Sequence, residues 1–153
     1  MVARCWRARI SVGAISAVGV GLLAVADTSF AHNSGGALAH VINASDTQVA
    51  LARCTLVSNG GLLATDRDLV AVSGGSLVMT ASQVSLNWGA TLALRGLVAA
   101  SNVTDSSFEL NFNPRQRSLI AVDGCAGGLT IARSTISYNL GTSESLCVLL
   151  DNG

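Results

Sequence analysis

The acidic residues that lie closest together in the sequence are Asp66 and Asp68, which flank Arg67. Acid–base cleavage of a glycan needs two carboxyl groups held about 5 to 9.5 Å apart. Residues i and i+2 share a face only in a strand, and the glycine pairs Gly60-Gly61 and Gly74-Gly75 around this segment favour a loop. We therefore expect a solvated loop here and predict no catalytic residue.

The histidines and cysteines form no recognisable reactive site either. His32 and His40 are eight residues apart with no Ser or Asp arranged about them, so we expect ordinary surface residues. The cysteines are Cys5, Cys54, Cys125 and Cys147, which include no CxxC pair and with two His make no zinc set. A disulfide between Cys125 and Cys147 stays open, although we favour buried thiols. We predict no metal and no cofactor.

The charge distribution excludes several function classes. Nine basic residues, all of them Arg, balance nine acidic residues. The absence of Lys excludes Schiff-base chemistry and a P-loop phosphate site, and the scattered arginines make no clustered basic face for nucleic acid. We therefore expect no nucleic-acid partner and no small-molecule substrate.

An eleven-residue block recurs five times along the chain. Its third and eighth positions are apolar, its first is apolar in four of the five blocks, its sixth is small and its eleventh is always Asn. The blocks begin at Leu23, Val49, Leu77, Ser101 and Leu129, with spacings of 26, 28, 24 and 28 residues. These spacings are too short for propeller blades, and the LxxLxL pattern of leucine-rich repeats is absent. The repeat predicts an all-β fold, a right-handed parallel β-helix of about five coils.

The invariant eleventh position predicts an asparagine ladder. Equivalent residues of neighbouring coils lie about 4.8 Å apart, so each amide can donate to one neighbour and accept from the other. We favour this structural role over recognition of a ligand. The predicted ladder comprises Asn33, Asn59, Asn87, Asn111 and Asn139.

A second apolar run follows each block, in four cases after a glycine-containing turn. Each coil is therefore expected to contain two or three short strands. The second runs cover residues 37–41, 62–64, 91–94, 119–122 and 146–150.

Residues 1–26 admit two interpretations. Arg4, Arg7 and Arg9 precede an uncharged run that ends in Ala24-Val25-Ala26, as in a secretory signal peptide. Leu23 and Val25 also fill two apolar positions of the repeat, and we favour a first coil strand. We divide the chain into this N-terminal segment, 1–26, and β-helix repeats, 27–153. Solenoids need polar caps, and a coil-like start provides none, which predicts a piece of a longer array packed against neighbouring coils of a larger parent protein.

Two N-glycosylation sequons lie at Asn43 and Asn102. Asn102 falls inside a predicted strand whereas Asn43 is expected in a turn, so Asn43 is the better acceptor. Both are consistent with an exported glycoprotein.

Two families resemble parts of this sequence. Phe30-Ala-His-Asn33 followed by Gly35-Gly36-Ala37-Leu38 resembles the FxxN and GGA-type repeats of β-helical surface proteins such as the chlamydial polymorphic membrane proteins. The Ala/Val/Ser/Gly-rich coils, the arginines without lysine and stretches such as 69–77 and 99–104 look like the dispersed gene family 1 surface proteins of trypanosomes. That resemblance implies a membrane-associated, adhesin-like β-helix, of which this chain is a fragment or truncated copy.

From these observations we expect a non-enzymatic cell-surface or secreted module that binds host-cell or extracellular-matrix ligands. A bacterial autotransporter passenger is a second member of this class. The alternative is a polysaccharide lyase or hydrolase, since many such enzymes use this fold. Asp27 and Asp105 share the fifth position of the repeat, but Arg53, Ala81 and Arg133 hold it elsewhere, so no contiguous acidic patch is expected.

Overall fold

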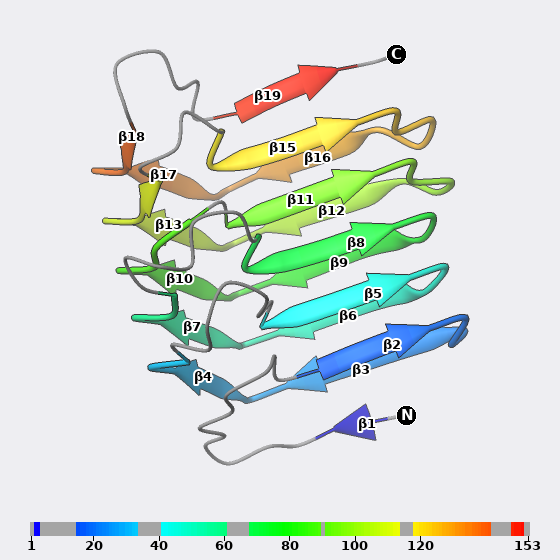
Figure 1. Cartoon of the computed structure of the whole chain (residues 1–153), viewed down its shortest axis with the longest axis horizontal. Coiled ribbons are helices and arrows are strands. Elements are labelled where there is room, and N and C mark those ends of the chain that lie inside the picture. The colour runs from blue at the N-terminus through cyan, green and yellow to red at the C-terminus, as the bar shows by residue number, and fades with distance from the viewer. Residues whose placement is uncertain are drawn as a thin grey trace.

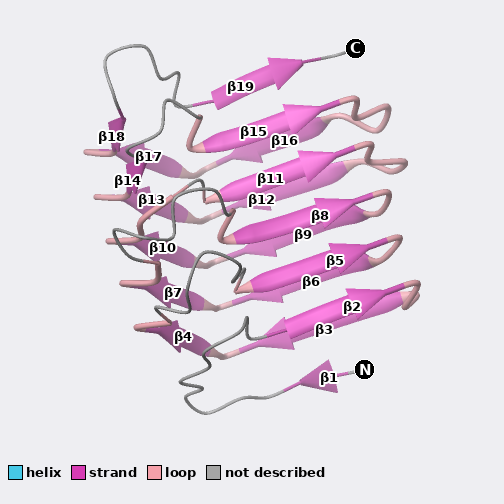
Figure 2. Cartoon of the chain, viewed as in Figure 1, coloured by secondary structure: helices cyan, strands magenta, loops and turns pink. Residues whose placement is uncertain are grey.

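The computed structural model describes residues 2–3, 15–33, 41–60, 68–89, 91–113, 118–141 and 148–151. Within these ranges every regular element is a strand, and all strand pairs are parallel. The strands stack as short rungs into a solenoid (Figures 1 and 2). No helix in this part of the chain is long and apolar enough to span a membrane.

Three parallel sheets form the walls of the solenoid. Sheet one contains β2 (Ile15–Val18), β5 (Ile42–Ser45), β8 (Val70–Ser73), β11 (Leu92–Arg95), β15 (Ile120–Asp123) and β19 (Val148–Asp151). Sheet two contains β1 (Val2–Ala3), β3 (Leu22–Ala26), β6 (Gln48–Ala52), β9 (Ser76–Thr80), β12 (Ser101–Thr104) and β16 (Leu129–Ala132). Sheet three contains β4 (Ser29–Ala31), β7 (Thr55–Val57), β10 (Gln83–Ser85), β13 (Ser107–Glu109) and β17 (Thr135–Ser137). A small fourth sheet pairs β14 (Phe112–Asn113) with β18 (Leu140–Gly141).

Each coil visits the sheets in the same order, from sheet one to sheet two to sheet three. In Figure 1 the strands of sheet one run to the right in front, and those of sheet two return behind them as the chain climbs, which is a right-handed path. Sheet three has five rungs, and the solenoid makes about four turns. The predicted parallel β-helix is therefore confirmed, with the five blocks of the repeat forming the five rungs.

The positions of the sequence repeat coincide with the register of the strands. Leu23 pairs with Val49 and Val49 with Leu77, which are the first positions of three successive blocks. Residues at the first, third, sixth, eighth and eleventh positions point inward and are buried in the middle coils. The core is thus a set of columns of like side chains, with Val, Leu, Ile, Met and Phe at its centre.

Three bends per coil separate the sheets, and all of them use a left-handed backbone. The first bend joins sheet one to sheet two at Gly19, Asp46, Gly74, Gly96 and Gly124, with φ from 50° to 66°. The second bend joins sheet two to sheet three at Asp27, Arg53, Ala81, Asp105 and Arg133, with φ from 48° to 52°. The third bend follows sheet three at His32, Ser58, Leu86, Leu110 and Tyr138, with φ from 53° to 57°. In the second and third bends the side chain of the bend residue points outward, and the next residue lies at the small sixth position or at the Asn position of the repeat.

The strands of sheet one differ from the predicted second apolar runs in two coils. The runs at 91–94, 119–122 and 146–150 overlap β11, β15 and β19. In the earlier coils the strands lie later, at β5 and β8, whereas residues 37–40 and 62–64 fall outside the described residues. The prediction left open whether each coil has two or three strands, and the structure has three, because the second bend divides the eleven-residue block.

Residues 15–26 of the N-terminal segment lie in the first coil as β2 and β3. Strand β3 pairs with β6 over five residues, from Leu22↔Gln48 to Ala26↔Ala52. The boundary drawn after Ala26 coincides with the second bend, where Asp27 turns the chain toward β4.

Candidate functional site

The five predicted ladder asparagines lie in one column directly after the third bend. Nδ2 of Asn33 donates to Oδ1 of Asn59 over 2.7 Å, and Nδ2 of Asn59 donates to Oδ1 of Asn87 over 3.0 Å. The same bond joins Asn87 to Asn111 over 2.9 Å and Asn111 to Asn139 over 3.0 Å. The side chains therefore form one continuous chain of hydrogen bonds along the inside of the solenoid.

Two further bonds per rung complete this ladder, and the sequence did not indicate them. The second Nδ2 hydrogen of Asn87 donates to the carbonyl oxygen of Leu56 over 2.9 Å, and Asn59, Asn111 and Asn139 repeat this contact. The backbone N–H of each of the first four Asn also donates to the Oδ1 of the next. Both amide donors and the oxygen of Asn87 are thus satisfied, which allows its burial.

A second ladder follows the second bend. Backbone N–H groups of Cys54, Ser82 and Ser106 each donate to the hydroxyl oxygen of the equivalent serine one coil further on, over 3.1 to 3.2 Å. The hydroxyl of Ser82 in turn donates to the carbonyl oxygen of Thr80 over 2.9 Å. Cys54 belongs to this column as a buried free thiol, and burial raises its pKa. The prediction of a buried thiol holds for Cys54.

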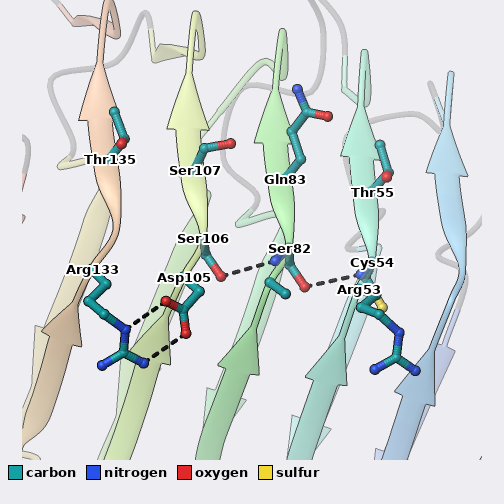
Figure 3. A pocket seen from close by; sticks show the side chains of 11 residues that line it. Arg53, Cys54, Thr55, Ser82, Gln83, Asp105, Ser106, Ser107, Arg133 and Thr135 are labelled. Atoms are coloured by element: carbon teal, nitrogen blue, oxygen red, sulfur yellow. Dashed lines mark hydrogen bonds and ion pairs between the residues drawn. The ribbon is translucent and has the colours of Figure 1, made fainter.

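The outer side of the second bend is hollowed into a shallow corner groove of about 570 Å³ (Figure 3). Arg53, Asp105 and Arg133 extend into the groove from the second bend. Ala81, in the middle of the same column, has only a methyl group. The groove is lined by Arg53, Ala81, Asp105 and Arg133 of the bend, by Cys54, Ser82 and Ser106 of the hydroxyl ladder, and by Thr55, Gln83, Ser107 and Thr135 of sheet three.

The charges of the corner groove are paired between neighbouring coils. Nε and Nη2 of Arg53 donate to the two carboxylate oxygens of Asp27, over 2.6 and 2.7 Å, and Arg133 binds Asp105 in the same way. The hydrogen bonds from Arg133 lower the pKa of Asp105. The two aspartates of this column are therefore separated, and each forms an ion pair with an arginine.

The expectation of a solvated loop at 66–68 is wrong for Asp68. Its side chain is buried, with 6% of its surface exposed, and its Oδ2 contacts the Arg95 guanidinium over 3.1 Å. Arg95 ends β11 one coil further on and brings a positive charge to the carboxylate. Asp66 and Arg67 lie outside the described residues.

The glycosylation candidates both lie in strands. Asn102 lies in β12, as predicted, and is half-buried. Asn43 lies in β5 rather than in a turn, because its register with Ala71 places it within sheet one, but its side chain is exposed. His32 is an exposed third-bend residue, as expected. His40, Cys5 and Cys147 lie outside the described residues, and Cys125 is a free, half-buried thiol.

Exposed apolar side chains gather at the third bend of the last three coils. Leu86, Leu110 and Tyr138 are 49%, 54% and 81% exposed on successive coils. Two residues further along each coil lie Trp88, Phe112 and Leu140, which pair in parallel. The Trp88 and Phe112 rings meet edge to face with centroids 4.8 Å apart.

We call these six residues the apolar ridge. The first two coils place His32, Ser58 and Gly60 at equivalent points, so the ridge is confined to one part of the surface. Sequence reasoning missed it because the block was aligned only as far as Asn. Extending the alignment by one position, and considering the tenth position with it, would have revealed the ridge.

Among the described residues no group of three or more His, Cys, Asp or Glu side chains could hold a metal ion. Comparison of the chain with protein-family models, with curated proteins and with solved structures finds no match.

Proposed function

We propose that this chain is a non-enzymatic β-helix module of the cell surface or extracellular space that binds host-cell or extracellular-matrix ligands. The observation that carries the proposal is the apolar ridge. Soluble proteins rarely leave aromatic and leucine side chains clustered at the surface unless they bind another molecule there. Trp, Tyr and Phe are also enriched in protein interfaces.

The rigid backbone beneath the ridge supports a binding role. Side chains on successive rungs keep a spacing of about 4.8 Å, so the ridge is ordered before a ligand arrives and little conformational entropy is lost on binding. The resemblance to trypanosome surface proteins agrees with this proposal and with placement at the cell surface. Membership of that trypanosome family is part of the same proposal.

The test is a binding assay on cells and matrix proteins with substitutions at the third bend. We expect the double change Leu110→Asn and Tyr138→Asn to reduce binding at least tenfold. Asn tolerates the left-handed backbone of these positions, so the fold is preserved. The matched control places the same residue at the same bend of the first two coils, His32→Asn and Ser58→Asn. Equal binding by both variants would overturn the proposal.

The alternative, a polysaccharide-active enzyme, predicts turnover that depends on a carboxylate pair. Asp68 is buried and bound to Arg95, and the lowered pKa of Asp105 makes it a poor proton donor at neutral pH. We expect no cleavage of pectin-like or other acidic glycans, with or without calcium, and we expect cell binding to survive Asp66→Asn with Asp68→Asn. Glycan cleavage that disappears in that double variant would make the protein an enzyme.

A further inference from the structure

The corner groove contains a row of polar side chains whose hydrogen-bonding groups the fold does not use. Thr55, Gln83, Ser107 and Thr135 occupy the same outward position of sheet three on four successive coils. Neighbouring coils lie about 4.8 Å apart, so the row is about 14 Å long. Figure 3 shows the four side chains on one face of the sheet. None of them forms a side-chain hydrogen bond among the residues that the structure describes.

The backbone beneath this row is already paired. Strands β7, β10 and β13 each pair with a neighbouring strand on both sides, which uses the backbone N–H and carbonyl groups of sheet three. The hydroxyls of Ser82 and Ser106 are likewise bound within the hydroxyl ladder. A ligand in the corner groove must therefore be recognised by outward side chains, and it cannot bind by adding a strand.

Two ion pairs border a gap above Ala81. On one side Arg53 leans toward Asp27, and on the other side Asp105 leans toward Arg133. The backbones of Arg53 and Asp105 are two coils apart, which is about 10 Å. Only the methyl group of Ala81 lies between them in this column, so the gap is the place where a ligand can reach the wall.

The groups around the gap include both donors and acceptors of hydrogen bonds. The hydroxyls of the polar row and the carboxamide of Gln83 can do both. Arg53 uses two of its five N–H hydrogens for Asp27, and Asp105 accepts two hydrogen bonds from Arg133 with about four lone-pair positions. Further donors therefore border the gap on one side and further acceptors on the other.

This combination of groups selects an uncharged ligand rich in hydroxyls. An anion would meet the carboxylate of Asp105, and a cation would meet the guanidinium groups of Arg53 and Arg133; like charges placed together at an interface disfavour binding. An apolar ligand would cover the hydroxyls of the polar row without replacing their hydrogen bonds to water. A neutral saccharide avoids both costs, because each of its hydroxyls is a donor and an acceptor.

We infer that the corner groove binds a neutral oligosaccharide. The saccharide lies along the polar row, with one sugar ring over Ala81 and its hydroxyls bonded to Gln83, Arg53 and Asp105. The length of the row suits several linked sugars better than one. This inference goes beyond the proposed function, which rests on the apolar ridge at the third bend.

The first test measures binding of the full-length chain to an array of neutral oligosaccharides built from glucose, galactose, mannose and N-acetylglucosamine, with heparin and polygalacturonate as acidic comparisons. We expect at least one neutral oligosaccharide to bind saturably and the acidic polymers to bind at least tenfold more weakly. Isothermal titration with the best neutral oligosaccharide then gives the reference affinity. No neutral ligand on the array, or stronger binding of the acidic polymers, would overturn the inference.

The second test fills the gap with side chains that the second bend already accepts. Arg and Asp both occupy this column in the same left-handed conformation as Ala81, so Ala81→Arg and Ala81→Asp keep the fold. We expect each to weaken binding at least tenfold, and a loss in both shows that the gap is blocked whichever charge is added. The control Ala81→Gly leaves the gap open and should bind normally. Unchanged affinity in the Arg and Asp variants would place the saccharide elsewhere.

The third test removes the polar row. Gln83→Ala with Ser107→Ala should weaken binding at least tenfold. The matched control, Gln48→Ala with Ser29→Ala, removes the same exposed side chains outside the groove and should have no effect. The ridge variant Leu110→Asn with Tyr138→Asn should also keep full saccharide affinity, which separates this site from the proposed function. Loss of saccharide binding in the ridge variant alone would assign the sugar to the ridge and overturn the inference.

Discussion

At the scale of single residues, the interior polar side chains form columns that repeat as regularly as the apolar columns. Asn87 donates two side-chain hydrogen bonds, accepts two more and is 1% exposed. A buried amide is tolerated only because repetition supplies its partners. Each Asn of the ladder depends on its neighbours for its hydrogen bonds. Replacing one Asn therefore destabilises the coils on both sides of it.

Replacing Asn87 by Leu should lower the free energy of unfolding by about 3 kcal/mol, because donors on Asn59 and the acceptor on Asn111 stay buried without partners. Urea denaturation measures this change. The matched control Asn43→Leu alters an exposed strand residue and should change stability by less than about 0.5 kcal/mol. Similar losses at the two positions would contradict a ladder that stabilises the fold.

The buried thiol gives a second prediction at this scale. Burial raises the pKa of Cys54, so less thiolate is present at pH 8 than for an ordinary cysteine, and only the thiolate reacts. We expect iodoacetamide to modify Cys125 in the folded chain and Cys54 only in denaturant, as measured by peptide mass spectrometry. Equal rates for the two in the folded chain would show that the second bend opens readily.

At the scale of elements, the bends determine the path of each coil. The second bend places five residues of three chemical types, Asp, Arg and Ala, in the same left-handed conformation. Residue type therefore carries little signal for this bend, and the sequence did not reveal it. The inward columns were predictable because their side chains meet the same surroundings in every coil.

The sheet-one strands were harder to predict because the loops before them differ in length. Strand β11 begins five residues after Asn87, whereas β5 begins nine residues after Asn33. Pairing with neighbouring strands, rather than local sequence, decides where each begins. The groove and the ridge escaped prediction for a related reason, because they depend on outward positions that the core does not constrain.

Replacing Ala81 by Gly should raise the free energy of unfolding by about 0.5 to 1 kcal/mol. A left-handed conformation costs a residue with a Cβ about 1 to 2 kcal/mol, and the greater freedom of Gly in the unfolded chain offsets part of that gain. The control Ala50→Gly, in the interior of β6, should lower the free energy of unfolding by about 0.5 to 1 kcal/mol. Changes of the same sign, measured by thermal or urea unfolding, would argue against the bend geometry.

At the scale of the whole molecule, the protein is a stack in which each coil contacts only its neighbours. The apolar ridge runs along three successive coils of this stack. We expect far-ultraviolet circular dichroism of the chain to show strand with almost no helix, and a helical spectrum would contradict the fold.

The backbone hydrogen bonds between coils run along the axis of the solenoid, and β1 and β19 lie at its opposite ends (Figure 1). A pulling force applied along this axis would stretch those bonds directly. Each interface between two coils has its own bonds and its own share of the core, so it can fail without its neighbours. As a mechanical tether, the protein would extend in steps, one coil at a time, and its remaining coils would keep their surface intact under load.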